Sequence, residues 1–132
     1  MKFIQIAGVI DKAEAEMLIK NDVEYLGFPL RLPVNKEDLT EEEAAELISS
    51  FNNAAKGVLI TYLNLAEEIK EFCKKLNVRI VQLHGNISTN ELIKLKSIDP
   101  SLTIIKSLVV RENNISNLQE IVATHSEYVD YF

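Results

Sequence analysis

The chain has 132 residues, 47% of them hydrophobic, which is enough for one ordinary domain with a real core. Its 20 acidic and 14 basic residues give a formal net charge of −6, which argues against nucleic acid as a partner, since proteins that bind nucleic acid use basic surfaces. The amino terminus lacks a secretory signal pattern and no apolar run reaches membrane-spanning length, so we expect no membrane association and a cytoplasmic location. The single cysteine, Cys73, lies in a helical pattern, where we expect a buried thiol.

Apolar segments alternate with amphipathic ones along the whole chain. The predicted strands are residues 3–7, 23–28, 57–62, 78–83, 102–109 and a last one near 127–132. Five helices lie between them, and each opens with a predicted capping pair: Asp11 with Glu14, Thr40 with Glu43, Asn64 with Glu67, Ser88 with Glu91, and Ser116 with Gln119. In such a pair the first side chain accepts from an early helical amide and the second reaches back, which fixes where the helix begins.

Repeated strand-helix-strand units indicate a parallel sheet with right-handed crossovers, which is either an open doubly wound sheet or a (β/α)8 barrel. Gly8 follows the first strand without the glycine-rich turn of a dinucleotide fold, which weakens the doubly wound alternative. Barrels average about 250 residues, so five βα units and the start of a sixth strand amount to part of one. We therefore predict the α/β class, of the (β/α)8 TIM-barrel type but incomplete, as a single partial barrel domain over residues 1–132.

The segment 78–85 is an apolar strand that ends in polar groups, as expected of a buried parallel strand that delivers functional side chains at its carboxyl end. His84 is suited to hydrogen-bonding a substrate, and Gly85 allows a ligand to approach closely. Gln82 lies two residues earlier and shares the same face. The alternative for His84 is a histidine that orders its own loop.

Three elements together carry a resemblance: Ala7-Gly8 after the first strand, Leu26-Gly27-Phe28 in the second, and Val81-Gln82-Leu83-His84-Gly85 in the fourth. They resemble the phosphoribosylanthranilate isomerase family. The resemblance implies a (β/α)8 barrel of tryptophan biosynthesis that rearranges a phosphorylated aminoaldose into an aminoketose, an Amadori-type reaction. It also implies a phosphorylated amino sugar as ligand and no cofactor or metal ion.

The catalytic positions depart from the family. Its first-strand pattern is Lys-apolar-Cys-Gly, with the cysteine as general base, whereas this chain has Gln5-Ile6-Ala7-Gly8. Ala7 cannot accept a proton, a step that contributes about 10²- to 10⁴-fold. The family's general acid is an aspartate at the end of strand six. Asp130 falls at the beginning of that strand, so we expect a loop or early strand residue there, with the general acid as the alternative. The family's base and acid positions are thus not retained in this chain.

Three cations are further candidates for substrate binding. The family has a ligand-contacting arginine after strand two, where Arg31 matches by type and Lys36 by position; the alternative is two solvated loop charges. Lys106 lies within an apolar strand, where an unpaired ammonium is costly. We expect it to point into the barrel mouth and pair with an anion, with Schiff-base chemistry as a remote alternative.

Two hypotheses remain open. One is a phosphoribosylanthranilate isomerase-like protein that is truncated or catalytically impaired. The other is a non-catalytic relative, a half-barrel that binds a sugar phosphate or assembles with itself. An incomplete barrel exposes strand edges and apolar surface, so we expect a homodimer or pairing with the missing barrel half.

Overall fold

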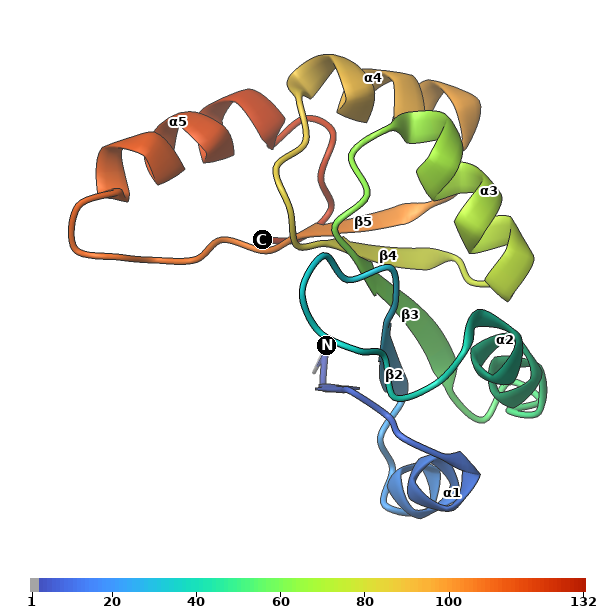
Figure 1. The fold of residues 1–132 in the computed structure, drawn as a ribbon. Coiled ribbons are helices and arrows are strands. Elements are labelled where there is room, and N and C mark those ends of the chain that lie inside the picture. The colour runs from blue at the N-terminus through green and yellow to red at the C-terminus, as the bar shows by residue number, and fades with distance from the viewer. Residues whose placement is uncertain (1–2) are drawn as a thin grey trace.

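A parallel five-stranded sheet is the centre of the molecule, seen in a computed structural model that describes residues 3–132 (Figure 1). Its order is β1-β2-β3-β4-β5, and the strands are β1 (Gln5–Ala7), β2 (Tyr25–Pro29), β3 (Lys56–Thr61), β4 (Ile80–Leu83) and β5 (Thr103–Lys106). The helices are α1 (Lys12–Lys20), α2 (Glu41–Ser49), α3 (Ala66–Leu76), α4 (Thr89–Ile98) and α5 (Ile115–His125). Helices α1 to α4 follow the outer side of the curved sheet (Figure 1). The predicted α/β class and incomplete barrel type are confirmed.

The predicted sixth strand begins beside β5 as a single parallel bridge between Ile105 and Tyr131. The Lys106 amide donates to the Tyr131 carbonyl at 2.8 Å, and the Tyr131 amide donates to the Ile104 carbonyl at 3.2 Å. β5 itself ends at Lys106, three residues before the predicted end at residue 109. The chain direction after α5 is therefore the one that a parallel barrel requires.

The two faces of the sheet belong to separate apolar clusters, as strand alternation demands. On the outer face, strand residues pack against the helices in one continuous core that includes Leu26, Phe28, Leu59, Val81, Leu83 and Ile104. On the inner face a smaller cluster contains Tyr25, Val58, Ile60 and Ile80, with Phe3 and Ile105 packed against it. Cys73 is buried in the outer core, as predicted, and burial raises the pKa of its thiol to about 12.

Three aromatic rings cover the inner face at the amino ends of the strands. The Phe3 ring stacks on Tyr25 with 4.2 Å between centroids and on Tyr131 with 5.6 Å. Phe3 precedes the first strand and Tyr131 follows the fifth, so the sheet curls far enough for its two ends to share one stack. This curl gives the sheet an inner and an outer side.

Three of the five predicted helix caps are present. Thr40 and Glu43 form a complete capping box, and Asp11 and Ser88 each accept from the amide three residues later. The predicted cap at Ser116 is wrong, because α5 already begins at Ile115. Asn114 precedes it and folds the preceding loop instead, accepting from the Arg111 amide and donating to the Val109 carbonyl.

The predicted cap of Asn64 with Glu67 is also wrong, and the start of α3 is capped from another helix. α3 follows Leu65 without a side-chain cap of its own. The Glu91 carboxylate, in the first turn of α4, accepts from the Ala66 amide at 2.7 Å. This carboxylate therefore satisfies a free amide of α3 and ties the two helices together on the outer side of β3 and β4.

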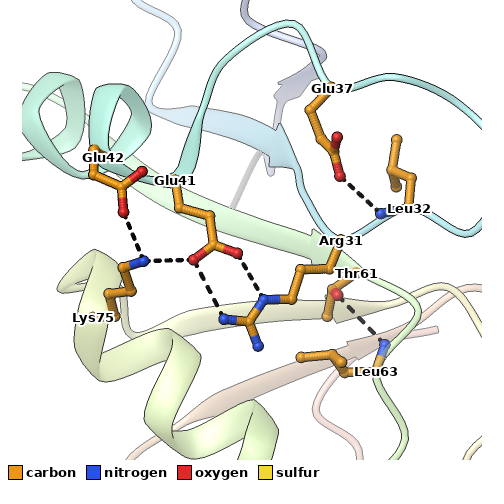
Figure 2. A network of polar contacts seen from close by, with 8 residues as sticks. All are labelled: Arg31, Leu32, Glu37, Glu41, Glu42, Thr61, Leu63 and Lys75. Carbon is orange, nitrogen blue, oxygen red and sulfur yellow. Dashed lines mark hydrogen bonds and ion pairs between the residues drawn. The ribbon is translucent and has the colours of Figure 1, made fainter.

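The loop after β2 is held by a cluster of charges between α2 and α3 (Figure 2). The Arg31 guanidinium donates to both carboxylate oxygens of Glu41, at 2.8 and 3.3 Å, and lies 3.9 Å from the centre of the Phe72 ring. Lys75 donates to Glu41 at 2.6 Å and to Glu42 at 2.9 Å. Arg31, then Lys75, hold the pKa of Glu41 at about 2, against the opposing effect of burial.

We expect Glu91→Ala to lower the free energy of unfolding by about 1 kcal/mol, the usual value of a helix cap. The matched control is Glu67→Ala, whose exposed side chain pairs with Lys94 at 3.4 Å, and which should cost at most about 0.5 kcal/mol. Urea titration of the variants measures both values. Equal losses would show that the hydrogen bond from the Ala66 amide to Glu91 stabilises the protein no more than an exposed ion pair between the same two helices.

We expect Glu41→Gln to flatten the dependence of stability on pH between about pH 5 and pH 2. A lowered carboxyl pKa contributes stability that is present above the ordinary range and lost as the pH falls towards the folded-state value. Because the Glu41 side chain is 25% exposed, we expect about 1 kcal/mol at neutral pH. Denaturant titrations across this pH range measure the effect, with the exposed Glu46→Gln on the same helix as control. An unchanged pH profile would contradict the expectation.

Candidate functional site

A chain of neutral polar side chains crosses the inner face of the sheet. The Gln5 amide, in β1, donates to the Gln82 side-chain oxygen, in β4, at 2.8 Å. The Gln82 amide donates in turn to the Ser107 hydroxyl oxygen at 2.9 Å, just after β5. All three residues are partly exposed. The predicted candidate Gln82 is thus the middle of a three-residue chain that spans the sheet from its first strand to its last.

Gly27 provides the room for this chain. A Cβ added at this position would lie 3.1 Å from the Gln5 side-chain nitrogen, 3.1 Å from the Ala7 Cα and 2.7 Å from a methyl carbon of Ile60. A side chain there would displace the Ile60 methyl group and crowd the Gln5 amide and the Ala7 backbone. The resemblance motif Leu26-Gly27-Phe28 therefore has a local steric reason in this structure.

Ala7 ends β1 beside Gly27, to which it is paired in the sheet. It is exposed, and its methyl group offers neither a proton acceptor nor a donor. Gly8 follows with φ of +82°, and its amide donates to the Gly27 carbonyl at 3.0 Å. The backbone turn after β1 is therefore formed, while the side chain at position 7 brings no acid-base chemistry.

His84 and Gly85 follow directly after β4, beyond Gln82. The His84 ring meets the Tyr62 ring edge-on, with centroids 5.1 Å apart, and its Nδ1 is buried without a hydrogen-bond partner in the part of the chain described. A Cβ added at Gly85 would lie 3.0 Å from the Tyr62 carbonyl oxygen, so this glycine permits the close approach to β3. The structure brings Gln82, His84 and Gly85 together; ligand binding by them remains a prediction.

Arg31 and Lys36 do not join this group. The Arg31 guanidinium is held by Glu41 and Phe72 on the helix side, as shown in Figure 2, and Glu41 raises the pKa of Arg31. Lys36 is exposed in the loop that leads to α2. Substrate binding by Lys36 remains a prediction, and binding by Arg31 would require the guanidinium to leave Glu41.

The prediction that Lys106 points into the barrel mouth is wrong. Its sheet partner is Leu83, a residue of the outer core, and its own side chain is 5% exposed. The Lys106 ammonium donates to the Ser107 carbonyl at 2.7 Å and to the Leu83 carbonyl at 3.4 Å. Burial lowers its pKa. Backbone carbonyl oxygens, rather than a ligand anion, are thus what stabilises this ammonium.

His125, at the end of α5, is the buried residue of that helix. Its Nδ1 has no partner among the described residues, and its pKa is lowered by burial and by the charge of Lys106. Figure 1 shows the other end of α5 extending away from the sheet. His125 therefore lies near Lys106 and apart from the inner face.

Asp130 lies beside the amino-terminal part of β5. Its carboxylate accepts from the Ile104 amide at 2.7 Å and from Lys96 at 2.8 Å. This pairing anchors the last residues to the sheet and to α4. Asp130 thus lies at the start of the sixth strand, whereas a general acid would be needed at the carboxyl ends of the strands.

Sequence reasoning missed Gln5 and Ser107. The signal for Gln5 was present, since it is a polar residue between Ile4 and Ile6 in an apolar strand, as Gln82 is between Val81 and Leu83. Its partner could not be identified because β1 and β4 are not neighbours in the sheet. Ser107 was counted within a longer predicted strand, which concealed its place at the strand end.

Between Phe3 and Phe132, no three His, Cys, Asp or Glu side chains are grouped so that they could hold a metal ion. Within the same span, none of the helices is long and apolar enough to cross a bilayer.

Known proteins resemble this chain over most of its length. The family model described as N-(5'-phosphoribosyl)anthranilate (PRA) isomerase matches residues 4–130. A PRA isomerase of Clostridium beijerinckii is 29% identical over 110 residues, which are 83% of this chain and 47% of the relative. One from Staphylococcus haemolyticus is 22% identical over 129 residues, 98% of this chain and 60% of the relative. The chain thus spans about half of the first of these relatives and three fifths of the second.

Solved structures agree on the fold. The PRA isomerase of Thermotoga maritima superposes with a TM-score of 0.80 at 18% identity, covering all of this chain and 62% of that protein. The isomerase of Thermococcus kodakaraensis gives 0.78 at 18% identity, covering 98% and 62%. The family model spans nearly the whole sequence and the fold is that of the corresponding part of these barrels, so the chain belongs to the PRA isomerase family.

Proposed function

We propose that this chain serves the PRA isomerase reaction of tryptophan biosynthesis, the conversion of a phosphorylated aminoaldose to an aminoketose, as a single partial barrel domain over residues 1–132. The observation that carries the proposal is the family match over residues 4–130. A cytoplasmic location and a phosphorylated amino sugar as ligand go with it. A related PRA isomerase structure contains a reduced carboxyphenylamino-deoxyribulose phosphate, a ligand of this class.

The inner face supports this proposal with a cradle of suitable chemistry. Gln82 offers hydrogen bonds to sugar oxygens, and the buried, unpartnered His84 Nδ1 is a further polar atom at the same strand end. Gly85 lets this strand end pack closely against Tyr62. Lys36 is exposed in the loop between β2 and α2, and it would serve a phosphate. Parallel barrels bind ligands at this end of their strands.

Ala7 supports a second candidate, a non-catalytic relative that binds a sugar phosphate or assembles with itself. The position at which the family pattern has its general-base cysteine is an exposed methyl group here. Without a base, the site would retain binding and lose the proton transfer that drives the isomerisation. Both candidate functions therefore predict binding of a sugar phosphate, and only the isomerase function predicts turnover.

Turnover of phosphoribosylanthranilate by this chain, followed by loss of substrate fluorescence, separates them. We expect turnover at least about 10²-fold below that of an intact isomerase, and an increase of at least tenfold for Ala7→Cys, because the substitution restores a proton acceptor. The matched control is Ala13→Cys, an exposed position on α1. No turnover by either the chain or Ala7→Cys, alone or with the remaining barrel strands supplied, would exclude the isomerase function.

We further propose that the open edges of the sheet take additional strands, from a second copy of the chain or from the missing barrel half. β1 is an edge strand of the described sheet, and Ile4, Ile6, Tyr131 and Phe132 are exposed near the two edges. The Thermotoga maritima isomerase is dimeric. Unpaired strand edges with apolar side chains favour such association.

Light scattering after size exclusion tests this assembly. We expect a dimer of the chain alone, with Ile6→Lys shifting it towards monomer because a charge on an edge strand opposes pairing. Ile93→Lys, an exposed position on α4, is the matched control. A stable, non-aggregating monomer across micromolar concentrations would contradict the proposal.

A further inference from the structure

The Gln5–Gln82–Ser107 chain has two ends that no protein contact occupies in the hydrogen bonds described. Gln5 donates to Gln82, so its own side-chain oxygen is left as an acceptor, and Ser107 accepts from Gln82, so its hydroxyl hydrogen is left to donate. One end of the chain is thus an acceptor and the other a donor. Both are partly exposed on the inner face of the sheet.

The row of hydrogen bonds would still have one donor end and one acceptor end if all of its bonds ran in the opposite direction. If both amides rotate by 180°, Ser107 donates to Gln82 and Gln82 donates to Gln5, which leaves a donor at Gln5 and an acceptor at Ser107. The two orientations have the same number of bonds. The chain therefore matches a ligand whose groups both donate and accept, and a sugar hydroxyl is such a group.

The backbone around this chain is fixed from both sides of the sheet. The Ser107 amide donates to the Leu83 carbonyl at 3.1 Å, which keeps Ser107 in register beyond the end of β5. From the outer side, Lys106 binds the carbonyl of Ser107. On the other flank, Gly27 leaves the space in which the Gln5 amide lies. The three polar side chains are therefore held in position before any ligand binds, which reduces the entropic cost of binding.

The three side chains Gln5, Gln82 and Ser107 are uncharged, which limits the ligand groups that they suit. Gln5 occupies the first position of the strand-one pattern, where the resembled family has lysine, and Ala7 occupies that of its cysteine. This part of the inner face is consequently neutral, and the ammonium of Lys106 points to the opposite side. A neutral strip of amides and a hydroxyl suits the hydroxyl groups of a sugar and has no cation for its phosphate.

We propose that Gln5, Gln82 and Ser107 form one hydroxyl-binding strip that recognises the neutral sugar part of a sugar phosphate. Gln5 and Ser107 are thereby assigned as specificity-determining residues, at the two ends of the strip. The proposal rests on the proposed function for its ligand class. It does not depend on turnover, because the strip transfers no proton.

Calorimetric titration of the 132-residue chain with ribose 5-phosphate and with inorganic phosphate tests the strip. We expect ribose 5-phosphate to bind more tightly, because inorganic phosphate has no sugar hydroxyls. Gln5→Ala and Ser107→Ala should each weaken ribose 5-phosphate binding about fivefold, the effect of one neutral hydrogen bond of about 1 kcal/mol. Phosphate binding should not change. Ser97→Ala, an exposed serine on α4, is the matched control and should change neither.

Equal affinities for the two ligands, or no binding of ribose 5-phosphate, would overturn the proposal. So would folded Gln5→Ala and Ser107→Ala variants that retain full affinity. If Gln5→Ala does not fold, Ser107→Ala decides alone, since it removes one partly exposed hydroxyl. Failure of the proposed function has a different outcome: ribose 5-phosphate still binds through the strip, while phosphoribosylanthranilate is not turned over.

Discussion

The curl of the parallel sheet is the constraint on which the rest of the structure depends. Neighbouring strands lie about 4.8 Å apart, so β1 and β4 in a flat sheet would be separated by about 14 Å. Their side chains Gln5 and Gln82 nevertheless meet at 2.8 Å. Phe3 likewise reaches Tyr131, which lies beyond the fifth strand. Only a sheet that bends inward lets such distant strands share contacts.

Because the sheet is curled, its outer and inner faces have different side chains and different surroundings. The outer face has large apolar residues against α1 to α4 and contains most of the core. The inner face has a smaller apolar cluster with aromatic rings at the amino ends of the strands, and a chain of neutral polar groups that runs from Gln5 at the start of β1 to Ser107 just after β5. Polar side chains therefore converge on the inner face, while the helices on the other side keep the strands in register.

Charged residues are mostly engaged on the outer side. Arg31 is held by Glu41 beside Phe72, and Lys106 by backbone carbonyls at the ends of β4 and β5. Both cations stabilise the loops and strand ends that surround the site. Their effect on a ligand is therefore indirect, through the backbone that they fix. The three linked side chains on the inner face, Gln5, Gln82 and Ser107, are by contrast neutral.

The sequence by itself determined the alternation of strands and helices, the parallel sheet and the family, because these follow from local periodicity and short motifs at strand ends. It also placed Gln82, His84 and Gly85 at one strand end. It predicted the start of two helices wrongly. An amide at the start of α3 is capped by Glu91 from another helix, and Asn114 precedes α5 without a capping contact.

Only the tertiary structure decided which face each polar residue serves. Lys106 was expected to point to the inner face of the sheet, but its side chain lies on the outer, helix-covered face. Successive side chains of a strand point to opposite faces, so a shift of one residue reverses the face. Gln5 and Ser107 join Gln82 across strands that are not neighbours, and no local pattern encodes such a contact. The physical reason is the same in both cases: the sheet's register and curl are set by packing over the whole molecule.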